Sequence, residues 1–179
     1  MKQNAPSGAG RAIIVAAALV LLLARPGGAQ TIVLVSSDWN LSAGTGDLAL
    51  PGAGLDFAAS WRQWATSDAQ ITITTGTGTR WYVTAHLRVP VGQSWPAGLS
   101  VYVIRTGDGT SGEGGADIVG PLNTPLGPLP TEPLGATPAT AFFNGKKSRN
   151  NVPVTLRIEG LTATIPAGTY QIEVVYTVN

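Results

Sequence analysis

The chain has 179 residues, with 11 Lys and Arg, 10 Asp and Glu, one His and no Cys. A formal net charge of +1 provides no basic surface for nucleic acid, and the lack of Cys excludes disulfides, thiol nucleophiles and Cys-ligated metals. Only 12% of the residues are charged and 23 are Gly, a composition typical of strands and turns rather than helices.

The first residues have the pattern of a secretory leader. Lys2 and Arg11 make a positive start, and an unbroken apolar run follows from Ala12 to Ala24. That run is shorter than the roughly 20 residues of a membrane-spanning helix. The small residues after it end at Ala29 in the pattern of a cleavage site. We predict that residues 1–29 are a signal peptide removed after Ala29. The alternative is a short anchor that is never removed, although no Cys is present for a lipoprotein anchor.

Cleavage would leave residues 30–179, a suitable length for one domain with its own hydrophobic core. Loss of Lys2, Arg11 and Arg25 turns the charge of +1 into about −2. We therefore expect a secreted protein, extracellular, at the cell surface or in the periplasm. We expect no nucleic-acid partner and no membrane span in the mature chain.

Five segments after the leader alternate apolar and polar residues with period two, which predicts strands with one buried and one exposed face. They are residues 70–75, 79–89, 99–105, 154–160 and 169–178. In 79–89 the only histidine, His86, falls on the polar side. The predicted buried side of that segment is Trp81, Val83, Ala85, Leu87 and Val89.

Turn signals separate these strands, among them "GTGT", "PAG", "TGDGTSGEGG" and "FNGKK", since Gly and Asn-Gly favour tight turns. Short alternating strands with regular turns indicate a sandwich or barrel. We predict an all-β domain over residues 30–179, a single immunoglobulin-like or pilin-like antiparallel β-sandwich of about seven to nine strands.

A Pro-rich loop at residues 118–138 interrupts the alternation with six prolines. Proline lacks the N–H that a central strand needs, so an extended loop with polyproline character is expected. One interpretation is a surface connection that lies on the sandwich through its leucines. The other is a recognition segment for an aromatic groove on a partner. The leucines are Leu122, Leu126, Leu129 and Leu134.

The residues give no pattern of catalysis. His86 has no accompanying nucleophile motif such as Gly-x-Ser-x-Gly, so we predict a non-enzymatic protein that needs no cofactor. One His and no Cys make a zinc site improbable on ligand count. The carboxylates Asp108, Glu113 and Asp117 lie in a glycine-rich loop, but without the spacing of a known calcium loop.

Tryptophans are the main indication of a ligand, because the chain has five of them. Trp61 and Trp64, in "WRQW", could stack on sugar rings from a flat face of the sandwich. The alternative for both is ordinary core and rim packing, which tryptophan often provides. A carbohydrate-binding module is therefore the second predicted function.

The closing stretch resembles the end of small secreted bacterial β-sandwich surface proteins, among them spore coat protein U-like and fimbrial-type domains. The matching residues are Gly168, Thr169 and Tyr170, followed by the alternation of Ile172 to Val178. "DWNL" near the mature start, with the closing "YQIEVVYTV", is similar to the WxL cell-surface proteins. The resemblance implies a non-catalytic surface subunit.

An exposed strand edge can add a strand from another chain. The candidate exchange segment is Thr31, Ile32, Val33, Leu34 and Val35, which could pair in its own domain or in a second copy. We predict a structural or adhesive surface protein, fimbria-like in its assembly, whose partners are copies of itself, another surface protein or a glycan.

Overall fold

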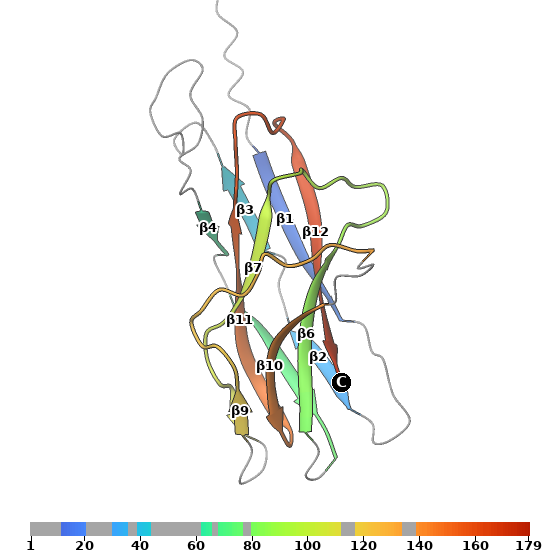
Figure 1. Cartoon of the computed structure of the whole chain (residues 1–179), viewed down its shortest axis with the longest axis vertical. Helices are drawn as coiled ribbons and strands as arrows, with labels where there is room; N and C mark the ends of the chain where they lie inside the picture. Colours follow the sequence, from blue (N-terminus) through green and yellow to red (C-terminus); the bar gives the residue numbers. More distant parts are fainter. Residues whose placement is uncertain are drawn as a thin grey trace, which may run out of the picture.

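The computed structural model describes residues 12–20, 30–35, 39–43, 62–65, 68–76, 80–111, 117–133 and 139–179. These residues form strands and connections without a helix, so the described part contains no helix that could cross a membrane. The strands make two stacked sheets (Figure 1), and the prediction of an all-β sandwich is confirmed.

The first sheet has the strand order β3-β1-β12-β6-β10-β9. Its pairs are antiparallel except β1 with β12, which run parallel. Its strands are β3 (Trp39–Ala43), β1 (Ala12–Val20), β12 (Thr169–Val178), β6 (Arg80–Arg88), β10 (Thr140–Lys146) and β9 (Asp117–Val119).

The second sheet is built around β11, the longest strand (Arg149–Glu159). On one side β11 pairs with β5 and β4, and β2 pairs with β5; on the other side it pairs with β7 and β8. The strands beside it are β2 (Thr31–Val35), β5 (Ala69–Thr74), β4 (Arg62–Trp64), β7 (Ser100–Arg105) and β8 (Thr110–Ser111).

All five strands predicted from alternation are present as β5, β6, β7, β11 and β12. The estimate of seven to nine strands for residues 30–179 is too low, since the described residues of that range form eleven, β2 to β12, several of them only two or three residues long. The core receives the predicted faces of both sheets. Fully buried members include Trp81, Val83, Ala85, Leu87, Leu156, Ile158, Ile172, Val174 and Tyr176.

The turn predicted at "FNGKK" is present, but it lies at Lys147 and Ser148, between β10 and β11, and Lys147 has a φ of 61°. Asn144 and Gly145 lie inside β10. Gly145 pairs with Trp81 of β6, and a Cβ at Gly145 would stand 2.5 Å from the backbone carbonyl oxygen of Asp117 in β9 and 2.5 Å from Cζ2 of the Trp81 ring. The indole Nε1 of Trp81 in turn donates a 2.6 Å hydrogen bond to the carbonyl of Lys147. Glycine is therefore required for the close approach of the ring and not for a turn.

The Pro-rich segment acts as a strap, defined here as residues 121–133, which runs along β7 of the second sheet and reaches β6 of the first (Figure 1). Its backbone N–H groups bond at every third residue, the repeat of a polyproline-type chain. Three of them bond the edge of β7, and that of Glu132 bonds the carbonyl of Leu87 in β6 at 2.8 Å. The three are Asn123 to Arg105, Leu126 to Val103 and Leu129 to Val101.

Two leucines of the strap pack on the core as the first interpretation expected. Leu129 is buried, and Leu126 is partly buried against the core cluster. Leu122 is exposed, and Leu134 lies outside the described residues. The strap thus takes the place of a strand beside β7, where its prolines cost no hydrogen bonds because other residues donate.

Tyr176 of β12 is fully buried, and its hydroxyl has no hydrogen-bond partner among the described residues. Its ring stacks on Phe142, with 6.1 Å between ring centroids. Burial raises the pKa of Tyr176 far above its ordinary value, because the phenolate would lose its hydration. The side chain therefore serves as an apolar core residue that carries an unsatisfied polar atom.

We predict that Gly145→Ala lowers the free energy of unfolding by about 1–3 kcal/mol, because the new methyl group overpacks against Trp81. Urea unfolding of the purified protein measures the change. The matched control is Gly168→Ala, where the nearest atom to a Cβ is 3.7 Å away on Tyr170, and it should stay within about 0.5 kcal/mol of wild type. Equal losses in both variants would contradict the packing role of Gly145.

We predict that Tyr176→Phe raises the free energy of unfolding at neutral pH by about 1 kcal/mol, because it removes a buried hydroxyl without a partner. Above pH about 10 the unfolded chain loses the phenol proton while the folded chain keeps it. Wild-type stability should therefore fall as the pH rises, by up to about 1.4 kcal/mol per pH unit for this tyrosine. Urea unfolding between pH 8 and 11 should show a shallower fall in the variant, and identical slopes would refute this account.

Candidate functional site

The position of β1 in the first sheet determines how both edges of β12 are paired. β1 lies between β12 and β3 and runs parallel to β12 over eight residue pairs. The first pair is Ile13 with Thr169, and the last is Val20 with Tyr176. β3 is joined to the sheet through its antiparallel pairs with β1. One edge of β12 therefore pairs with β6 and the other with β1.

β1 consists of the first nine residues of the apolar run in the predicted leader. The rest of the leader, residues 1–11 and 21–29 with the cleavage site at Ala29, lies outside the described residues. The leader and its removal remain predictions. The structure adds that Ala12–Val20 forms a strand in the sandwich when it is present.

The candidate exchange segment Thr31–Val35 is β2, and it pairs along its length with β5 of its own domain. Ile32 is buried in the core while Val33 is exposed. β2 lies at the end of its sheet order, so its second edge has no strand partner among the described residues. In-domain pairing, the first of the two alternatives, is what the structure contains.

The two candidate stacking tryptophans differ in outcome. Trp61 lies outside the described residues. Trp64 ends β4 and is 45% exposed. Directly opposite it in register is Arg157 of β11, and opposite Arg157 on the far side is Tyr102 of β7. The guanidinium carbon of Arg157 lies 5.5 Å from the Trp64 ring centroid and 4.8 Å from that of Tyr102.

These three side chains form a cross-strand row on the outer face of the second sheet, called here the aromatic row: Trp64, Arg157 and Tyr102. Glu159 holds the row in place. Its carboxylate forms an ion pair with Arg157 at 2.8 Å and accepts a hydrogen bond from the Tyr102 hydroxyl. Burial, followed by the charge of Glu159 and this hydrogen bond, raises the pKa of Tyr102.

His86 lies on the outer face of β6 as predicted, but the expectation that it is exposed is wrong. It is 6% exposed, and its Nε2 lies 2.7 Å from the Glu132 carboxylate of the strap. Beside it is a cavity of about 600 Å³ whose described lining residues are Arg88, Val89, Glu132 and Pro133. Arg88 in this lining pairs with Glu173 at 2.6 Å. The contact between His86 and Glu132 attaches the strap to β6, because it lies beside the hydrogen bond from the Glu132 N–H to the Leu87 carbonyl.

The two described carboxylates of the glycine-rich loop, Asp108 and Asp117, contact different arginines. Asp108 pairs with the buried guanidinium of Arg105, which also donates to the Gly120 carbonyl at 2.7 Å. Asp117 lies 3.8 Å from Arg80, and Glu113 is outside the described residues. In the part of the chain that the structure describes, no group of three His, Asp or Glu could hold a metal ion.

Comparison of the chain with protein-family models, with curated proteins and with solved structures gives no match in any of the three. Function therefore has to be argued from the geometry of the strands and side chains.

We predict that Glu159→Gln lowers the pKa of Tyr102 but leaves it above its ordinary value, because the nearby negative charge is removed while burial remains. The pKa can be followed by NMR of tyrosine labelled at the Cζ carbon, with Tyr102→Phe to assign the signal. An unchanged titration in Glu159→Gln would contradict the contact between Tyr102 and Glu159.

Proposed function

We propose that the mature protein is a secreted, non-catalytic structural or adhesive subunit of a cell surface, which assembles like a fimbria by adding a β-strand from a second copy beside β12. The observation that carries the proposal is the pairing of β12 with β1, a segment that the sequence predicts to be removed with the leader.

Removal of β1 would leave two groups of backbone atoms without partners. The edge of β12 opposite β6 would lose its hydrogen bonds over Thr169–Tyr176, and β3 would lose the strand that joins it to the sheet. β3 carries Trp39, a fully buried core side chain. Since unpaired backbone groups next to an apolar core are costly, such a gap favours entry of another strand.

The gap also specifies what can enter. Ile172, Val174 and Tyr176 of β12 are fully buried, so a strand that replaces β1 has to be apolar on the matching face. β1 has alanine at positions 16 and 18, in register with Ile172 and Val174. Main-chain bonds would supply affinity, and the alternation of side chains would supply the register.

The candidate donor is Thr31–Val35 of a second copy, which is β-branched and apolar at the predicted mature N-terminus. As β2 it pairs with β5 in its own domain, so donation requires it to leave that place. The resemblance of the last strand to fimbrial-type and spore coat protein U-like domains supports the same mode of assembly.

We predict that the mature chain, residues 30–179, forms polymers in negative-stain images and elutes early in size exclusion, whereas the full chain with its leader retained is monomeric. The reason is that β1 occupies the edge of β12 only in the full chain. A monomeric mature chain at high concentration would overturn the proposal.

A matched pair of variants in the full chain tests whether β1 itself blocks assembly. Ala18→Lys places a charge in register with buried Val174, whereas Ala17→Lys is one residue away, in register with the carboxylate-bearing Glu173. Ala18→Lys should release β1 and allow polymers, and Ala17→Lys should not. The donor is tested separately: a mature chain lacking residues 30–35 that still polymerises would exclude Thr31–Val35 as the donated strand.

A further inference from the structure

We propose that the aromatic row binds a sugar ring of a surface polysaccharide, with one face of the ring stacked on Trp64. This site is independent of assembly at β12, because it lies on the outer face of the second sheet while β12 belongs to the first.

The row is a built feature rather than a chance exposure of one tryptophan. Its members come from three neighbouring strands, β4, β11 and β7, and are in direct register across the sheet. Arg157 lies between the two rings at cation–π distance, and its side chain is only 12% exposed. Because Arg157 already restricts the Trp64 ring, this ring loses little conformational freedom when a ligand binds.

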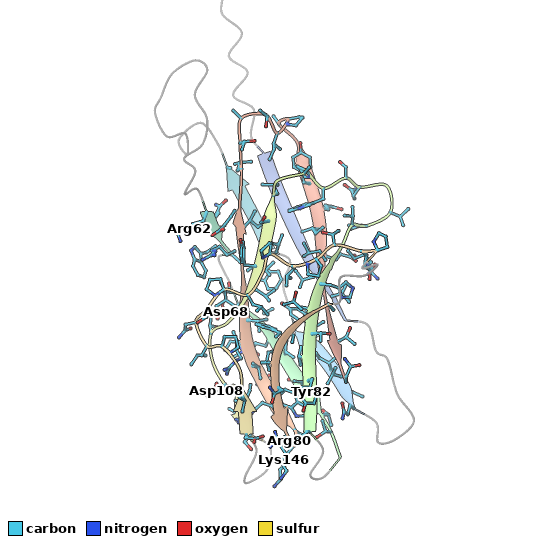
Figure 2. The ribbon with its side chains drawn as sticks, in the orientation of Figure 1. Arg62, Asp68, Arg80, Tyr82, Asp108 and Lys146 are labelled. Carbon is cyan, nitrogen blue, oxygen red and sulfur yellow. The ribbon has the colours of Figure 1, made fainter. Side chains whose placement is uncertain are left out.

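Polar groups lie beside the rings where a sugar would need them. Glu159 follows Arg157 by two residues on β11, so it lies on the same face of the sheet, and it is in register with Arg62 of β4 and with Ser100 of β7. Arg62 is exposed and lies at the side of the molecule on β4 (Figure 2). A guanidinium, a carboxylate and a hydroxyl together can donate to and accept from sugar hydroxyls.

The combination favours a saccharide over other ligands. A sugar with equatorial hydroxyls has an apolar C–H face for Trp64 and polar edges for Arg62 and Glu159. A purely apolar partner would instead cover charged groups without replacing their contacts with water. The row lies on the open outer face of a sheet, which suits one segment of a long chain rather than an enclosed small molecule.

The test is calorimetric titration of the full chain with β-1,4-linked hexasaccharides of glucose and of N-acetylglucosamine. We expect saturable binding to at least one of them and a loss of about fivefold in Trp64→Ala, since an aromatic contact of this kind is worth on the order of 1 kcal/mol. The matched control is Tyr82→Ala, an exposed aromatic residue on the first sheet (Figure 2), which should bind as wild type does.

A second measurement protects the test against misfolding of the variant. In the wild-type protein, the indole N–H signal of Trp64 should shift as the hexasaccharide is added, whereas that of buried Trp81 should not. No binding to either hexasaccharide, equal losses in Trp64→Ala and Tyr82→Ala, or an indole signal of Trp64 that never moves would each overturn the proposal. Because the full chain retains β1, failure here leaves the proposed assembly through β12 unaffected.

Discussion

Backbone pairing at both edges of β12 is the constraint on which the sandwich depends. β12 carries Ile172, Val174 and Tyr176 into the core, and it can be central only while strands lie on both sides of it. β6 is supplied by the folded domain, whereas β1 comes from the predicted leader. β1 also pairs with β3, so the burial of Trp39 of β3 in the core depends on the presence of β1.

The edge of β7 that faces away from β11 is covered by a different device. The strap donates backbone N–H groups to the carbonyls of β7 and then to Leu87 of β6, and Glu132 contacts His86 beside that last bond. An edge closed by a proline-rich segment of the same domain cannot easily accept another chain. The two sides therefore differ in kind: one is closed permanently from within, and the other depends on a segment that is predicted to leave.

Sequence alone predicted the strands with clear alternation, because a period of two is a local property that depends on one buried face. β12 was found to the residue, and the faces of β6 were assigned correctly. Asn144-Gly145 was mistaken for a turn since its real cause, the ring of Trp81, is distant in sequence. The same limit applied to the site: Trp64 was selected by residue type, but Tyr102 and Arg157 join it only through the register of three strands, which no local pattern contains.

The two proposed sites complement each other physically. Contacts between one protein surface and one sugar ring are weak, because an open strand face excludes little water. If copies join through β12, each adds its own aromatic row on the second sheet, and a polysaccharide long enough to reach several rows would bind far more tightly than one row allows. Assembly at one sheet would thus make weak recognition at the other sufficient for attachment to a surface.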